Sequence, residues 1–156
     1  MKDLQWDNVD KSSWPAGAWQ DEPDKKQWTD KATGLPCLIV RNAIGALCGY
    51  VGVGKAHPFH GDSYHDHYEL PAHGGLTFAA ACSAGPDPSV HVCHLTETGD
   101  EEPVWWFGFD CGHLGDLMPK YDREYRGLDE GASYKTISYV EGHVAALAEA
   151  LAAKAA

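Results

Sequence analysis

The sequence predicts an α+β protein with a single domain, in which a mainly antiparallel sheet packs against a long C-terminal helix. Three observations support this fold class. Short runs of β-branched and aromatic residues, each closed by turn residues, recur as far as residue 110. Apolar residues then recur every three or four positions near the C-terminus. The length of 156 residues, with 44% hydrophobic and 22% charged residues, suits one domain with one core.

Residues 1–34 are predicted to form a tryptophan-rich N-terminal arm that packs on a domain of residues 35–156. The arm is polar and contains prolines, yet it holds four of the six tryptophans. A purely disordered tail rarely carries so many aromatic side chains. We therefore expect the indole rings to pin the arm to the domain, where they either cover the core or line a ligand pocket.

The strands are predicted from runs of β-type residues bounded by turn residues. They span residues 37–41, 46–53, 75–82, 90–96 and 104–109. The first two runs flank a short turn and predict a hairpin. The glycines of the second run also match Gly-x4-Gly-Lys, the start of a phosphate-binding loop. However, Ala56 offers no hydroxyl for Mg²⁺, and Pro58 stands where the following helix should begin, so we interpret this run as a strand.

An amphipathic helix is predicted over about residues 134–153, with Ser133 as its N-cap. Its apolar positions recur in steps of three and four, at Ile137, Val140, Val144, Leu147 and Leu151. Two such heptads also fit a dimer seam, which leaves a homo-oligomer open, but packing on the sheet is the commoner use. A shorter helix is expected near residues 114–126, interrupted by Pro119.

The charge balance excludes one class of partner. The chain has 12 basic and 23 acidic residues, which give a net charge of −11. A surface this negative repels phosphate backbones, so we do not expect a nucleic acid polymer as partner. A small anionic or nucleotide ligand remains compatible, because a pocket needs few positive groups.

The cysteine pattern predicts a cytoplasmic protein with free thiols. The five cysteines are odd in number and include no CxxC pair, and the N-terminus lacks the apolar run of a signal peptide. Such thiols are typical of a reducing compartment. No apolar stretch approaches the roughly 20 residues needed to cross a bilayer, so we expect no membrane association.

The sharpest chemical signal is in WWFGFDCGHLGD, residues 105–116. Asp110, His113 and Asp116 follow the strongest predicted strand and would share one face of a helical turn. Two carboxylates and an imidazole can bind a divalent metal such as Zn, Mg or Mn, or can hold His113 as a base oriented by an aspartate. The competing interpretation is structural, with Asp110 as a helix N-cap.

A second signal is His73-Gly74-Gly75, at the end of a loop that holds five of the nine histidines. Paired glycines let the backbone present N–H groups to an anion, and the preceding histidine can exchange a proton. The alternatives for the histidine-rich loop are a metal site, acid–base catalysis or a solvated loop with no chemical role. Thr77 opens the next strand and would point into the same space.

These two signals predict a pocket between the loop of residues 57–77 and the turn of residues 110–116. His73 and His113 are the expected acid–base pair, with Asp110 and Asp116 either orienting them or holding the metal. The other expected ligand contacts are anion-binding glycines, one threonine, two cations and two stacking indoles: Gly74, Gly75, Thr77, Lys55, Arg41, Trp28 and Trp106.

Six segments together resemble a family of small, largely uncharacterised proteins from bacteriophages and bacteria. They are EPD (22–24), TGLPCLIVR (33–41), LCGYVGV (47–53), HPFHG (57–61), HGGLTF (73–78) and WWFGFDCGHLGD (105–116). The family has no settled activity, so the resemblance assigns no catalytic residue. It implies a phage-related context, in which compact cytosolic proteins counter host defence by cleaving or sequestering nucleotide immune signals.

The leading hypothesis is therefore a hydrolase that acts on a small phosphorylated or nucleotide ligand. The first alternative is an oligomeric sponge that sequesters such a ligand without turnover. The second is an inhibitor that presents its acidic surface to a basic protein partner. The acidic residues are scattered rather than continuous, which argues against the second alternative.

Overall fold

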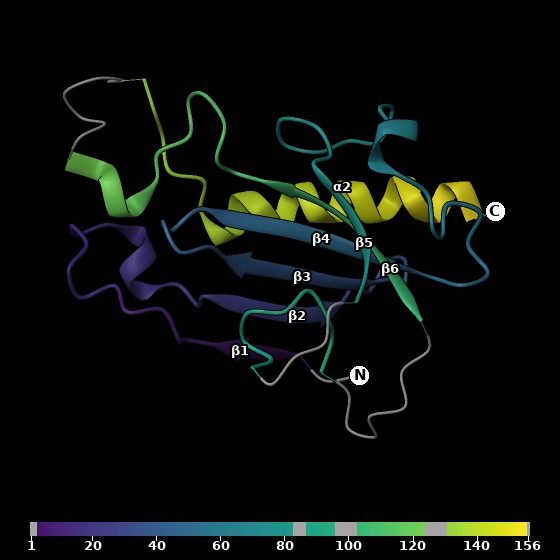
Figure 1. The fold of residues 1–156 in the computed structure, drawn as a ribbon, viewed down its shortest axis with the longest axis horizontal. Coiled ribbons are helices and arrows are strands. Elements are labelled where there is room, and N and C mark those ends of the chain that lie inside the picture. The colour runs from purple at the N-terminus through teal and green to yellow at the C-terminus, as the bar shows by residue number, and fades with distance from the viewer. Residues whose placement is uncertain (1–2, 83–86, 96–102, 124–130, 156) are drawn as a thin grey trace.

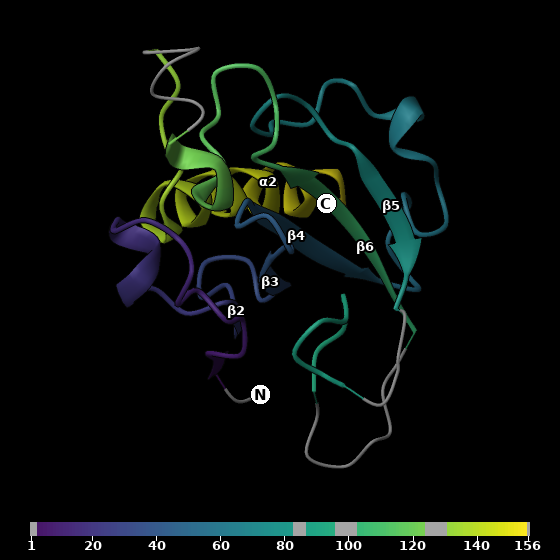
Figure 2. The same cartoon turned by 60° about the vertical axis from the view of Figure 1, so that its left-hand side comes forward.

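An antiparallel sheet with one long helix against one face makes up the fold (Figures 1 and 2). In this computed structural model, the residues described are 3–82, 87–95, 103–123 and 131–155. Within these ranges the sheet has six strands in the order β1-β2-β3-β4-β6-β5, and all neighbours run antiparallel. The predicted α+β class is therefore confirmed. The elements are β1 (Leu4–Trp6), β2 (Lys25–Thr29), β3 (Pro36–Arg41), β4 (Leu47–Gly54), β5 (Phe78–Ala81), β6 (Val104–Asp110) and α2 (Ile137–Ala155), with 3₁₀ turns at Ala18–Asp21, Tyr64–Asp66 and Pro119–Tyr121.

Local sequence patterns located most of the sheet. The predicted hairpin is formed by β3 and β4, the run expected at 75–82 contains β5, and the run expected at 104–109 matches β6 except for its last residue, Asp110. Residues 1–34, the tryptophan-rich arm, contribute β1 and β2 at one edge of the sheet. The strand expected at 90–96 is wrong for residues 90–95, whose backbone is held by side chains of β2 instead of by a neighbouring strand; residue 96 lies outside the described residues.

Helix α2 packs across β3 and β4 (Figure 1). Its predicted apolar stripe is buried in the core with side chains of these strands. Val140, Val144 and Leu147 are fully buried there, so they are not available for a dimer seam. The approach is closest at Gly49 of β4, where a Cβ atom would lie 2.6 Å from the Phe109 ring and 2.8 Å from Val144. In the described part of the chain, no helix combines the length and apolar character that crossing a bilayer demands.

The first turn of α2 is capped from the arm. Glu22 Oε2 accepts the N–H of Ile137 at 2.7 Å, and Thr136 Oγ1 accepts the N–H of Tyr139 at 3.2 Å. Ser133, the predicted N-cap, instead pairs through its backbone with the turn that follows β6. The helix therefore begins later than expected, because a distant carboxylate satisfies its first N–H group.

Residues 87–95, called the strap below, lie on the sheet face opposite α2 (Figure 2). Lys26 of β2 forms an ion pair with Glu141 of α2 at 2.6 Å, so its side chain points to the helix side. Side chains alternate along a strand. Lys25 and Gln27 therefore point to the other face, where both contact the strap.

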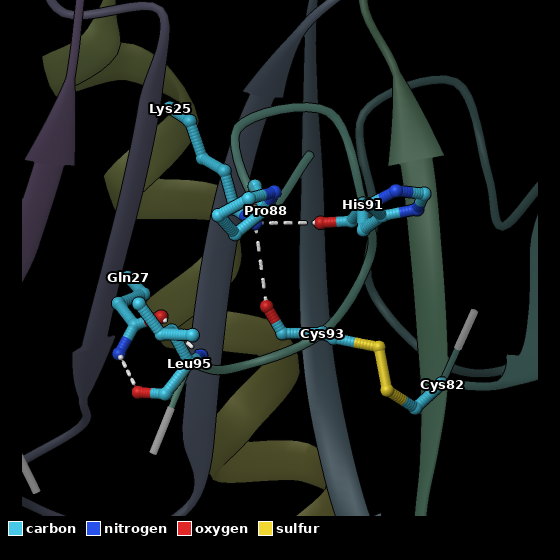
Figure 3. Close-up of a disulfide and its surroundings, with 7 residues drawn as sticks. All are labelled: Lys25, Gln27, Cys82, Pro88, His91, Cys93 and Leu95. Carbon is cyan, nitrogen blue, oxygen red and sulfur yellow. Dashed lines mark hydrogen bonds between the residues drawn. A yellow bond between two sulfur atoms is a disulfide. The ribbon is translucent and has the colours of Figure 1, made fainter. Parts of the chain in front are cut away.

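The strap holds Lys25 with its backbone (Figure 3). The Lys25 ammonium donates hydrogen bonds to the carbonyl oxygens of Pro88, His91 and Cys93, the last two at 2.7 and 3.3 Å. Burial lowers the pKa of Lys25 from its ordinary value of 10.5 to about 8, and the Asp87 carboxylate partly opposes this shift. The carbonyl oxygens replace much of the hydration that the buried ammonium has lost.

A disulfide between Cys82 and Cys93 joins the strap to the end of β5 (Figure 3). The expectation of five free thiols is wrong for this pair, whereas Cys37, Cys48 and Cys111 are free. The sequence showed no pairing pattern, because the two cysteines are brought together by the position of the strap on the sheet and not by a local motif.

Replacing Gly49 with Ala should lower the free energy of unfolding by about 1–3 kcal/mol, because the new methyl group overfills the contact between β4, Phe109 and α2. Urea denaturation followed by circular dichroism measures this change. Gly54→Ala is the matched control, since it lies on the same strand with nothing within 4 Å of the added Cβ. It should change stability by less than about 0.5 kcal/mol. Equal losses in both variants would contradict the close-packing argument.

Replacing Lys25 with Met should remove a pH dependence of stability. The folded-state pKa of about 8 lies below the ordinary value of 10.5, so the unfolded state binds more protons between these pH values. The free energy of unfolding of the wild type should therefore rise relative to Lys25→Met between pH 8 and 10.5, by up to about 1.4 kcal/mol per pH unit. Urea denaturation of both proteins across this range tests it, and a constant difference would count against the shifted pKa.

Candidate functional site

Three of the predicted site residues meet at one end of the sheet. His73 comes from the loop before β5, and His113 and Asp116 come from the turn after β6. One potential ligand atom of each residue lies within 4.8 Å of those of the other two. The loop and the turn therefore approach each other as the sequence predicted.

The Asp116 carboxylate is the centre of this cluster. Its Oδ2 lies 2.8 Å from His73 Nε2 and accepts the backbone N–H of His113 at 3.0 Å, and its Oδ1 lies 3.2 Å from Lys135 Nζ. Burial raises the pKa of Asp116, but the hydrogen bonds from His113, His73 and Lys135 outweigh this effect and hold the pKa below its usual value. Asp116 is therefore a carboxylate anion at neutral pH.

The His113 ring presents a buried nitrogen to two carboxylates. Its Nδ1 has no hydrogen-bond partner within the described ranges, yet it lies 3.5 Å from Asp110 Oδ1 and 3.8 Å from Asp116 Oδ2. A bare nitrogen lone pair facing two anions is repelled by them. The arrangement is therefore favourable when Nδ1 carries the N–H of the ring, as in one neutral tautomer, or when a metal ion lies between these atoms.

Asp110 is oriented from two sides. Its Oδ2 accepts the hydroxyl of Thr77 at 3.1 Å, and its Oδ1 accepts the N–H of Gly112 at 2.9 Å. The turn after β6 thus uses Asp110 as a local cap while leaving it next to His113. The expectation that Asp110 is a helix N-cap is wrong, because residues 111–116 form a turn and not a helix; Asp110 caps that turn instead.

Steric constraints explain why two glycines follow His73. Gly74 has a φ of +69°, and a Cβ atom there would lie 2.8 Å from the His113 ring. Gly75 has a φ of +86° and donates its N–H to the carbonyl oxygen of Ala72, which closes the turn. The pair lets the His73 loop approach the His113 ring, and the Gly75 N–H is already used within that turn.

Helix α2 contributes two residues that the sequence analysis missed. The Tyr139 hydroxyl lies 2.7 Å from His73 Nδ1, and the His143 ring centre lies 5.7 Å from that of His73. Burial, followed by the proximity of His73, lowers the pKa of His143. Tyr139 and His143 are four residues apart beside the apolar stripe, so they share a helix face; that spacing is the signal that could have identified them.

Two of the other predicted contacts lie elsewhere in the sheet. Lys55 follows the end of β4 that pairs with Val104, whereas Asp110 pairs with Cys48 near the start of β4, roughly 20 Å away. Trp28 lies on β2, which β3 and β4 separate from β6. Neither residue is brought to the His–Asp cluster.

The remaining two predicted contacts are buried. The Arg41 guanidinium donates to Asp24 at 2.8 Å and to the hydroxyl of Tyr134 at 2.8 Å. Trp106 is 1% exposed and lies against the ring of His94. A ligand could reach either side chain only after a rearrangement of its neighbours.

Comparisons of the chain with protein-family models, with curated proteins and with solved structures found no match. The fold and the cluster therefore define the class by themselves: an α+β protein with a histidine–aspartate centre where a loop, a turn and α2 meet. His73, His113 and Asp116 could hold a divalent metal, with Asp110 beside them. A set of nitrogen and oxygen donors of this kind suits zinc or another first-row transition metal.

Replacing Gly74 with Ala should displace His113, because the new methyl group collides with its ring. Gly75→Ala is the matched control: it carries the same strain of a positive φ, but nothing lies within 4 Å of the added Cβ. Both variants should lose about 1–3 kcal/mol of stability from backbone strain. Only Gly74→Ala should also shift the imidazole resonances of His113 in a histidine-detected NMR spectrum. Identical spectra for the two variants would contradict the proposed contact.

Proposed function

We propose that the protein is a metal-dependent hydrolase of a small phosphorylated ligand, with a nucleotide as the leading candidate. The observation that carries the proposal is the buried Nδ1 of His113, which faces Asp110 and Asp116 without a hydrogen-bond partner in the described residues. With His73 Nε2 at Asp116, the cluster offers two nitrogens and one carboxylate to one cation, and the Asp110 carboxylate lies beside His113.

The spacing of the donor atoms supports a metal ion. Donors that share a tetrahedral zinc ion at about 2.0–2.2 Å lie roughly 3.3 Å from each other. The separation of His73 Nε2 from Asp116 Oδ2 is 2.8 Å, and that of His113 Nδ1 from the same oxygen is 3.8 Å. Shifts of about half an ångström would bring these two pairs to the separation that a metal requires, and the donor atoms of His73 and His113 already lie within 4.8 Å of each other.

The residues around the donors have distinct roles in this proposal. When bound, the metal would acidify a water molecule and polarise a phosphoryl oxygen. Tyr139 is hydrogen-bonded to His73 Nδ1. It would hold the His73 ring in the orientation needed for Nε2 to bind the metal, as residues that hydrogen-bond to metal ligands commonly do. Asp110 is placed to act as a fourth ligand or to accept the proton of the attacking water.

The charges near the centre and on the whole chain favour a small phosphorylated ligand. Lys135, whose ammonium is 3.2 Å from Asp116, adds positive charge beside the centre, where a phosphoryl group would bind. The net charge of −11 disfavours a nucleic acid polymer and leaves a small ligand as the substrate. A nucleotide immune signal would also suit the phage-related context that the sequence resemblance implies.

Metal binding is tested first, without any substrate. We expect the purified protein to bind about one equivalent of Zn²⁺ by calorimetry, and His113→Ala to weaken binding at least 100-fold. His65→Ala is the control, since His65 is an exposed histidine outside the cluster. Elemental analysis below a tenth of an equivalent, together with no calorimetric response, would exclude the metal centre.

Turnover is tested with a panel of cyclic and linear nucleotides, analysed by chromatography with and without chelator. We expect metal-dependent product formation that falls at least 100-fold in Asp110→Asn and Asp116→Asn, but not in the exposed control Asp66→Asn. Circular dichroism verifies that each variant is folded. Recovery of intact nucleotide in amounts that match the protein would identify a sponge instead, and neither product nor bound ligand would refute the nucleotide proposal.

A further inference from the structure

The strap of residues 87–95 has no role in the proposed reaction, yet it is fastened at several points. At β2, Gln27 Nε2 donates to the carbonyl oxygen of Leu95 at 3.0 Å, and its Oε1 accepts the N–H of Leu95 at 2.8 Å. Further across the sheet, His94 Nε2 lies 2.8 Å from the carbonyl oxygen of Cys37 in β3. The strap therefore bonds to two neighbouring strands without being a strand itself.

The disulfide attaches the strap at the β5 edge of the sheet, away from the polar contacts at β2. Cys82 directly follows β5, the outermost strand on that side, while Lys25 and Gln27 belong to β2. The strands β3, β4 and β6 lie between them. The strap is thus attached to the sheet at two places: by the disulfide at the end of β5 and by hydrogen bonds at β2 (Figure 3).

The polar contacts at β2 depend on the placement of the strap. Lys25 is 1% exposed, and burial of an ammonium is unfavourable unless its hydrogen bonds are replaced. Here the replacements are carbonyl oxygens of the strap itself. Once the strap loses its position, hydration of Lys25 favours further opening, so attachment and release are two distinct states rather than a gradual change.

We propose that the Cys82–Cys93 disulfide is a redox-controlled clamp, and that its reduction releases the strap from the sheet face opposite α2. Release would uncover Trp106, against which His94 of the strap now packs. This clamp lies on the sheet face opposite α2 and shares no residue with the proposed metal centre.

The reductant required is a dithiol. One of its thiolates attacks the sulfur of Cys82, which is more exposed than Cys93, and Cys93 leaves as a thiolate. The second thiol of the reductant then displaces Cys82 and forms the reductant's own disulfide. Two electrons and two protons pass to the protein, which ends with two cysteine thiols.

The other cysteines do not compete in this exchange. Burial raises the pKa of Cys37 and of Cys111 to about 12 and that of Cys48 to about 11, so all three remain protonated. A thiol reacts as its thiolate, and these side chains are poor nucleophiles. The exchange is therefore confined to the pair that holds the strap.

Hydrogen–deuterium exchange of the full chain tests the clamp. Dithiothreitol should accelerate exchange of the strap amides at least tenfold while the amides of α2 keep their protection. Alkylation followed by mass spectrometry should show two additional thiols after reduction. The double variant Cys82→Ser/Cys93→Ser should exchange like the reduced wild type and should not respond to dithiothreitol.

Three outcomes would overturn the proposal. The first is equal exchange of the strap before and after reduction, which means that its polar contacts suffice. The second is the alkylation of all five cysteines without reductant. The third is a parallel loss of protection in α2, which would make the disulfide a general stabiliser rather than a clamp.

Discussion

The buried ion pair between Arg41 and Asp24 is the interaction on which the placement of the other elements depends. Both side chains are almost inaccessible, and Arg41 Nε lies 2.8 Å from Asp24 Oδ1. Such a pair stabilises a fold only when its other polar groups are also satisfied. Arg41 meets this condition by donating to Tyr134, whose hydroxyl donates to Glu22, the residue that caps Ile137. The arm, the hairpin and the start of α2 are thereby held in one network.

Anchoring the first turn of α2 has a direct consequence for the histidine–aspartate centre. Tyr139 and His143 stand in the first two turns of the helix and contact His73. The depth of the helix is set by its contact at Gly49, where no side chain separates it from β4. The position of the His73 ring between Tyr139 and Asp116 thus depends on how α2 is docked, and not on the histidine loop alone.

The two faces of the sheet carry different chemistry. One face packs the core against α2, and the other meets the strap, whose backbone satisfies Lys25 and Gln27. This explains why the sequence pattern of β2 does not indicate a strand. Lys25 and Gln27 of β2 are 1% and 0% exposed, although polar residues in a sequence usually indicate an exposed position. Their burial is favourable only because the strap supplies hydrogen-bond partners.

The sequence by itself determined the features that depend on neighbouring residues: the hairpin, the strands β5 and β6, the helical stripe, and the proximity of Asp110, His113 and Asp116 within one turn. Tertiary structure alone decided which distant groups meet them. His73 is separated from Asp116 by 43 residues and from Tyr139 by 66, and Cys82 and Cys93 meet because the strap lies on the sheet face opposite α2. Periodicity reports which side of an element is apolar, because burial follows the repeat of the helix or strand. It carries no information about which other element will cover that side, because that choice is made by packing across the whole domain.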